Sequence, residues 1–165
     1  MGEAKVGSEF VTHEFDEAIA IQRSIVKAED SLATAHPMAS AKRAIKSALT
    51  EDRRFLKQLE TMGKEHDASG KVEDVAAGLT ELMSSTLDSA TTERADSDFY
   101  EAHAVLLNLK RKQMDSAGGM RKIASALKDS RMRTAATAFE RAQRASSKAL
   151  ATELAAYAKV IAAAG

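Results

Sequence analysis

The chain has 165 residues, of which 44% are hydrophobic and 29% charged, and this balance excludes an intrinsically disordered protein. The length suits a single domain with a buried core. Its 24 basic and 24 acidic residues cancel, although acids concentrate in 67–101 and bases in 107–150, as on solvated helix faces or on surfaces that associate. The absence of cysteine excludes disulfides, thiol catalysis and thiolate metal ligands. We therefore expect a protein of a reducing compartment, the cytoplasm.

The N-terminal segment MGEAKVGSEF lacks the apolar stretch of a signal peptide, and its GSEF end has the composition of a cloning-site remnant. We expect residues 1–10 to be disordered and residues 11–165 to form one domain. The first helix is predicted to start near Thr12, which would cap it, with Glu14 and Asp16 in its first turn. No apolar run approaches the length needed to span a membrane.

Two long amphipathic helices are predicted on either side of His36-Pro37, because proline favours the first turn of a helix and restricts the residue before it. The predicted inward residues of the first helix are Phe15, Ile19, Ile25, Val26 and Leu32. Gln22 and Glu29 lie on the same face at seven-residue spacing from Phe15, which is unusual for core positions. The predicted inward residues of the second helix are Ala41, Ile45, Ala48, Phe55, Leu59 and Met62.

The second half of the chain predicts one short and two long helices. The polar stretch 63–70 ends the second long helix, and a short amphipathic helix is expected at about 72–87. The third long helix is expected to break or kink at Gly118-Gly119. Asp129 or Ser130 is expected to cap the fourth. Its predicted inward residues are Met132, Ala136, Phe139, Ala142, Ala149, Leu150, Tyr157, Val160 and Ile161.

The third long helix, which is predicted to begin near Thr92, is the central one. Its apolar stripe consists of Phe99, Ala102, Leu106 and Leu109. Glu101 and His103 flank this stripe, where residues of a bundle face a neighbouring helix. With four long amphipathic segments and no strand pattern, the sequence predicts an all-α fold. The expected architecture is an antiparallel four-helix bundle with a short crossover helix between the second and third long helices.

Two short segments and the order of the helices carry a family resemblance. The segments are Leu49-Thr50-Glu51-Asp52 through Leu59-Glu60 in the second helix and Phe99-Tyr100-Glu101-Ala102 in the third. With two long helices, a short one and two more long ones, the chain resembles the ferritin-like stress proteins of the YciE/YciF type over most of residues 12–160. The resemblance implies a core site of carboxylates and histidines, with Glu51 and Glu101 at carboxylate positions.

The implied metal site is incomplete. Ferritin-like di-metal proteins need a Glu on each of two helices and Glu-x-x-His on the other two, and the matching histidines are absent here. The rise per residue places Gln22, rather than Glu29, level with Glu51, and an amide is a poor ligand for a hard metal ion. The candidate layer is therefore Gln22, Glu51, Glu101 and Gln143.

Two functional hypotheses follow, beside a weaker third, an amphipathic bundle that opens on lipid. The first is a non-catalytic, stress-associated or scaffolding ferritin-like bundle that self-associates and has a degenerate di-metal site without a cofactor. The second is a ferritin-like di-iron or di-manganese oxidase or peroxide-handling enzyme that uses Glu51, Glu101 and His103 as ligands. The missing histidines favour the first, in which Arg53 and Arg54 are the nearest counter-charges for Glu51. The sequence indicates no small-molecule substrate and no specific nucleic-acid partner.

Overall fold

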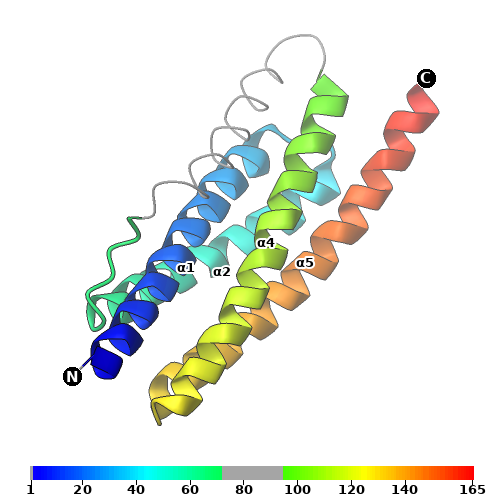
Figure 1. The fold of residues 1–165 in the computed structure, drawn as a ribbon. Helices are drawn as coiled ribbons and strands as arrows, with labels where there is room; N and C mark the ends of the chain where they lie inside the picture. Colours follow the sequence, from blue (N-terminus) through cyan, green and yellow to red (C-terminus); the bar gives the residue numbers. More distant parts are fainter. Residues whose placement is uncertain (1, 72–94) are drawn as a thin grey trace.

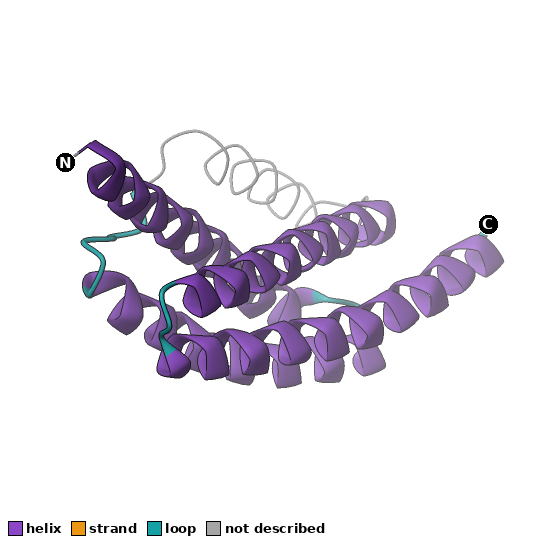
Figure 2. Cartoon of the chain, turned by 60° about the horizontal axis from the view of Figure 1, so that its bottom comes forward, coloured by secondary structure: helices purple, strands orange, loops and turns teal. Residues whose placement is uncertain are grey.

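The computed structural model describes residues 2–71 and 95–165, and all regular structure within these ranges is helical. The helices are α1 (Gly2–Ala35), α2 (Ala39–Lys64), α4 (Ala95–Ala126) and α5 (Ser130–Ala164). Each of these packs against two others: α1 contacts α2 and α4, and α5 contacts α2 and α4 (Figures 1 and 2). The predicted all-α class and the four long helices are confirmed. The short helix predicted at about 72–87 lies outside the described residues.

Local signals in the sequence set most helix ends. α1 ends at Ala35, directly before His36-Pro37, and α2 begins at Ala39 after an extended Met38. Asp129 caps α5 as predicted, since its carboxylate accepts a hydrogen bond of 2.9 Å from the backbone N–H of Met132. These breaks therefore follow from proline and capping chemistry alone.

The predicted start of the first helix at Thr12 is wrong, because α1 already begins at Gly2. Instead of capping, the Thr12 hydroxyl contacts the carbonyl oxygens of Ser8 at 3.0 Å and His66 at 2.7 Å. Nearby, Asp16 Oδ1 accepts hydrogen bonds of 2.7 Å from the backbone N–H groups of Ser69 and Gly70. The loop after α2 thus binds this part of α1, and a tertiary contact of this kind is not visible in a local capping pattern.

The loop itself depends on Gly70. Its φ of +76° lies in the left-handed region that favours glycine. A Cβ at this position would lie 2.6 Å from both Arg23 Nη1 and Ile19 Cγ2, so the backbone can approach α1 only without a side chain.

The predicted break at Gly118-Gly119 is also wrong, since α4 continues through both glycines to Ala126. Ala117 and Met120 are buried on either side of them, and this packing holds the helix together. A Cβ on Gly118 would make only an ordinary contact of 3.8 Å with Glu140 Oε1, so this position does not require glycine for space. The glycine pair is therefore accommodated within a continuous helix.

The core consists of two apolar clusters. The first contains Val11, Phe15, Ala18, Ile19, Phe55, Leu59, Met62, Ala68, Ala117, Met120, Ala124, Met132, Ala136 and Phe139. The second contains Ile21, Ile25, Ala28, Leu32, Ile45, Phe99, Ala102, Leu106, Leu107, Leu109, Leu150 and Tyr157. The predicted inward positions Ala149 and Val160 are exposed, because Leu150 and Tyr157, seven residues apart, define the buried face of α5.

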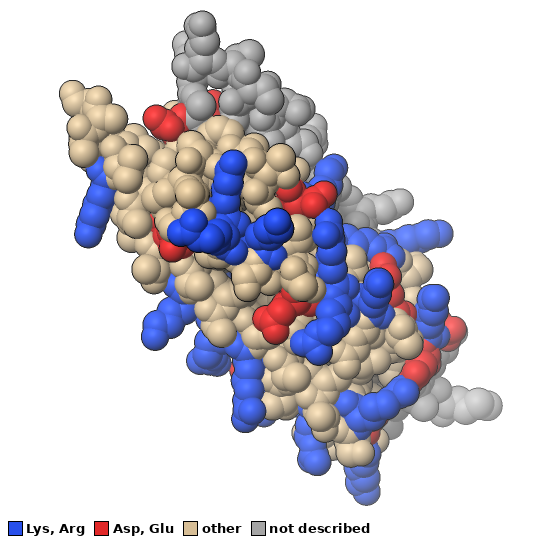
Figure 3. Space-filling view, turned by 180° about the vertical axis from the view of Figure 1, so that it is seen from behind, with Lys and Arg blue, Asp and Glu red and all other residues tan. Residues whose placement is uncertain are grey.

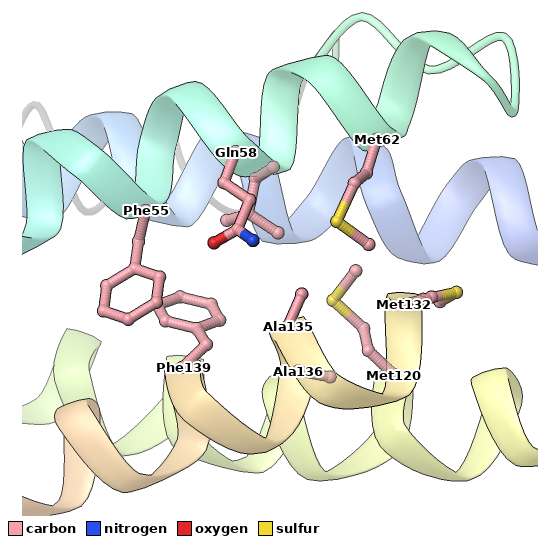
Figure 4. A pocket seen from close by; sticks show the side chains of 9 residues that line it. Phe55, Gln58, Met62, Met120, Met132, Ala135, Ala136 and Phe139 are labelled. Carbon is pink, nitrogen blue, oxygen red and sulfur yellow. The ribbon is translucent and has the colours of Figure 1, made fainter. Parts of the chain in front are cut away.

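We expect Phe55→Ala and Phe139→Ala each to lower the free energy of unfolding by about 3–5 kcal/mol. The two rings are 2% and 3% exposed and face each other with centroids 4.8 Å apart, at a small pocket between α2, α4 and α5 (Figure 4). Urea denaturation measures the change, and Phe10→Ala is the matched control because Phe10 is 53% exposed. Midpoints near wild type for both core variants would contradict this packing.

Candidate functional site

A layer of buried polar side chains lies between the two apolar clusters. It consists of Gln22 and Glu29 from α1, Asp52 from α2, Lys110 and Gln113 from α4, and Gln143 from α5, each at most 2% exposed. On α2, α4 and α5 these residues fall between the stretches that supply the first and second clusters. Because buried polar groups are costly unless they are bonded, the bonds of this polar layer must be accounted for in full.

The centre of the polar layer is an ion cluster. Lys110 Nζ donates to Glu29 Oε1 at 2.9 Å and to Asp52 Oδ2 at 2.5 Å. All three side chains are excluded from solvent, with exposures of 0%, 0% and 2%. Without this ammonium, a carboxylate charge would be left uncompensated in a medium of low dielectric constant, which is strongly unfavourable. Lys110 therefore supplies the cation that lets α1 and α2 place acidic side chains in the core.

The amides of the polar layer complete the bonding of Asp52. Gln22 Nε2 donates to Asp52 Oδ1 at 2.9 Å, and Gln143 Nε2 donates to the same oxygen. Gln113 Nε2 donates to the Ala18 carbonyl oxygen at 2.8 Å and to Gln22 Oε1 at 3.1 Å. Asp52 on α2 thus accepts hydrogen bonds from α1, α4 and α5, so one carboxylate connects all four described helices.

Burial raises the pKa of Glu29 from 4.5 to about 9, with Lys110 opposing the rise and Asp52 adding to it. The second carboxyl oxygen, Oε2, has no hydrogen-bond partner among the described residues, and this further disfavours a charged carboxylate. With Glu29 protonated at neutral pH, one carboxylate balances one ammonium. The ion cluster is then electrically neutral inside the protein.

The three residues proposed from the sequence as metal ligands do not converge. Glu51 is exposed and lies 3.9 Å from Arg54 on the surface, and Glu101 is exposed on α4. His103 is buried, but it contacts His36 and the carbonyl oxygen of Leu150. The enzyme hypothesis therefore loses the geometry on which it depended.

The error arose from helical phase. Successive residues of a helix differ by about 100°, so Asp52 points into the core while its neighbour Glu51 points outward. Gln22 and Gln143, the other two members of the predicted layer, are confirmed as buried at this level. Sequence reasoning missed Lys110 and Gln113 on α4, although Lys110 lies seven residues after the buried His103 and therefore on the same face of the helix.

Of the two predicted counter-charges for Glu51, Arg54 is confirmed, since its Nη2 lies 3.9 Å from Glu51 Oε1 at the surface, whereas Arg53 has another partner. Arg53 binds Asp30 at 2.8 Å with both side chains exposed, and the Arg54 guanidinium lies 4.6 Å from the centroid of the Phe55 ring. On the face shown in Figure 3, basic side chains project from much of the described surface with acidic ones between them. Exposed ion pairs of this kind contribute about 0–1 kcal/mol each. Only Lys110 of the basic run 110–112 is buried.

The donor set of the polar layer does not fit a di-metal centre. It contains two carboxyl groups, three amides and no histidine, and an ammonium group already binds both carboxyls. Within the described ranges, one group of side chains has metal-ligand spacing: His13, Glu14 and Glu17 on the surface of α1. Lys112 Nζ binds Glu17 Oε1 at 2.7 Å, so a lysine ammonium already pairs with a carboxylate of this group, as in the polar layer.

We expect Glu29→Gln to gain stability relative to wild type as the pH rises. Between pH 4.5 and about 9 the folded protein holds a proton on Glu29 that the unfolded chain has released, so this group makes the free energy of unfolding fall with rising pH. The amide keeps the shape and has no proton to lose. The difference between variant and wild type should grow by ~2 kcal/mol or more between pH 5 and pH 9.

Urea denaturation across this pH range measures the difference, and Glu101→Gln is the matched control because Glu101 is exposed. Parallel pH profiles for Glu29→Gln and wild type would contradict the protonated state of Glu29.

No protein-family model, no curated protein and no solved structure matches the chain. Within residues 2–71 and 95–165, no helix combines the length and apolar character needed to cross a membrane. The function must therefore be inferred from the polar layer itself.

Proposed function

We propose that this chain is a non-catalytic ferritin-like bundle protein, with a stress-associated or scaffolding role, in which Lys110 takes the place of a metal centre. The observation that carries the proposal is the position of the Lys110 ammonium, bonded to Glu29 and Asp52 in the middle of the core. In ferritin-like di-metal proteins, inward-facing side chains from four helices hold the metal ions. The polar layer of this chain also draws on four helices, but with amides and a lysine.

The positions of the helix ends support an antiparallel bundle with a crossover. His66 and Gly70, which follow α2, contact the first half of α1 through Thr12 and Asp16. Phe99, near the start of α4, lies 6.2 Å from His36 at the other end of α1, measured between ring centroids. The chain therefore leaves the described part at one end of α1 and returns at the other, as a crossover between the second and third long helices requires.

The chemistry of the polar layer supports a role without catalysis. A reactive di-metal centre needs ionised carboxylates and open coordination positions. Here the Lys110 ammonium donates hydrogen bonds to one carboxyl oxygen of Glu29 and one of Asp52, and Gln22 donates to the other Asp52 oxygen. Self-association remains part of the proposal, and exposed apolar side chains such as Leu127 and Val160 offer contact surface for it.

Metal analysis of protein purified without chelators tests the proposal. We expect the wild type to contain no stoichiometric iron or manganese and to melt at the same temperature with and without a chelator. Stoichiometric iron or manganese that is lost in Asp52→Asn would overturn the proposal in favour of a metal-dependent enzyme.

A lysine variant tests the role of the ammonium directly. We expect Lys110→Met to lower the free energy of unfolding by roughly 3–5 kcal/mol, because it leaves the buried acidic groups without their cation. Lys112→Met is the matched control, since Lys112 is partly exposed and pairs with Glu17 at the surface. Equal stabilities of the two variants, measured by urea denaturation, would contradict the role given to Lys110.

A further inference from the structure

Two buried histidines join three parts of the chain at one end of the helical bundle. His36 lies in the turn between α1 and α2, and His103 lies on α4, each 0% exposed. His36 Nε2 lies 3.2 Å from His103 Nδ1. At the two ends of this pair, the Met38 backbone N–H donates to His36 Nδ1 at 3.1 Å, and His103 Nε2 lies 2.9 Å from the Leu150 carbonyl oxygen on α5.

The two backbone groups fix the protonation of both rings. A backbone N–H can only donate, so His36 Nδ1 is an acceptor and its proton is on Nε2. A carbonyl oxygen can only accept, so His103 carries its proton on Nε2 and accepts at Nδ1. His36 Nε2–H then donates to His103 Nδ1. All four ring nitrogens are used, and both imidazoles are neutral.

An added proton has no free position in this hydrogen-bond chain. On His36 Nδ1 it would face the backbone N–H of Met38, and on His103 Nδ1 it would face the N–H of His36. Protonation of either ring therefore breaks a hydrogen bond that connects the α1–α2 turn to α4 and α5. Burial lowers the pKa of both histidines, that of His36 to about 4, and the neighbouring His103 ring lowers the pKa of His36 further.

The charged groups around the pair come from three helices. Lys42 on α2 lowers the pKa of His36, whereas Glu153 on α5 raises it and also raises that of His103. Glu153 is itself bound by the Ser40 hydroxyl at 2.7 Å. On α4, Asp96 accepts a hydrogen bond of 2.9 Å from the Tyr157 hydroxyl of α5.

The side of α1 that packs here is apolar, with Leu32 in the second cluster and Ala33 packed against it. Its nearby acid, Asp30, binds Arg53 at the exposed surface instead. Glu153 is therefore the acidic group that favours a charged imidazole. Its attraction does not reverse the effect of burial, since the His36 pKa stays well below 6.5.

The same contacts hold the C-terminal third of α5. Leu150 accepts from His103, Glu153 accepts from Ser40 and Tyr157 donates to Asp96. Beyond Tyr157, α5 continues to Ala164 with mostly exposed residues, Val160 among them at 55%. Besides the apolar packing of this part of α5 in the second cluster, its attachment thus rests on three hydrogen bonds, and the buried histidine pair is at their centre.

We propose that the His36–His103 pair is an acid-released latch, which holds residues 150–164 of α5 against the rest of the helical bundle and frees them when either ring takes up a proton. As the pH falls from 6.5 towards 4, the opened segment binds protons that the closed one excludes, so opening becomes more favourable. Below about pH 4 both states are protonated and the effect levels off.

A transition metal between the two rings is the competing use of this pair, since the two facing nitrogens are 3.2 Å apart. Metal binding at His36 Nε2 would require a proton on Nδ1, where the Met38 N–H already points. The hydrogen-bond chain therefore favours the latch, and zinc binding becomes an outcome that the test must exclude.

Hydrogen exchange measured by mass spectrometry on the full chain tests the latch. After correction for the intrinsic pH dependence of exchange, protection of residues 150–164 should fall about tenfold or more between pH 7 and pH 5. Protection of α2, residues 39–64, should change much less. Replacing the pair by apolar side chains in His36→Phe/His103→Leu should make protection of 150–164 independent of pH in this range.

His13→Gln is the matched control, because His13 is exposed and its loss should leave the pH response unchanged. Unchanged protection of 150–164 in the wild type at pH 5 would overturn the proposal. Nitrogen chemical shifts of the wild-type histidines give a second test that needs no variant. Both rings should be neutral with the proton on Nε2 at pH 7, and an Nδ1–H ring, a charged ring, or zinc bound by both rings would each refute the latch.

Discussion

The hydrogen bonds of the Lys110 ammonium to Asp52 and Glu29 are the interactions on which the interior of this protein depends. Glu29 and Asp52 lie where water does not reach, and an unpaired buried charge costs several kcal/mol. The cation comes from α4, so α1, α2 and α4 can pack only in the arrangement that brings its ammonium to both carboxyl groups. Gln143 extends this constraint to α5, because it donates to Asp52 as well.

The apolar clusters impose a weaker constraint. Burial of apolar surface is non-directional, so the clusters alone discriminate less between helix registers than hydrogen bonds of fixed geometry do. A displacement of one helix by a turn would move Lys110 about 5 Å from its partners and leave the polar layer unpaired. We infer that the polar layer selects one register of the helices. Its net contribution to stability is smaller, since well-packed apolar residues of similar volume often stabilise a core as well as a buried ion pair does.

The sequence predicted the elements of the fold better than it predicted their contacts. The break at His36-Pro37 and the Asp129 cap follow from local chemistry, and both are confirmed. The start of α1 and the continuity of α4 through Gly118-Gly119 were mispredicted, because tertiary packing, which a local pattern does not show, contributes to both. At the site, the periodicity identified Gln22 but did not separate Asp52 from Glu51. Its ion partner on α4 was read as part of a surface charge run.

Protonation acts in opposite directions on the two buried polar groups of this protein. Glu29 binds its proton more tightly in the folded state, and His36 binds its proton less tightly. Between pH 4.5 and 6.5, acidification therefore stabilises the folded state through the first and destabilises it through the second, and in global unfolding the two contributions oppose each other. A local opening of the C-terminal part of α5 involves only the histidines, so nothing offsets their effect. Mild acid should therefore open one end of the protein while the polar layer keeps the remaining helices in register.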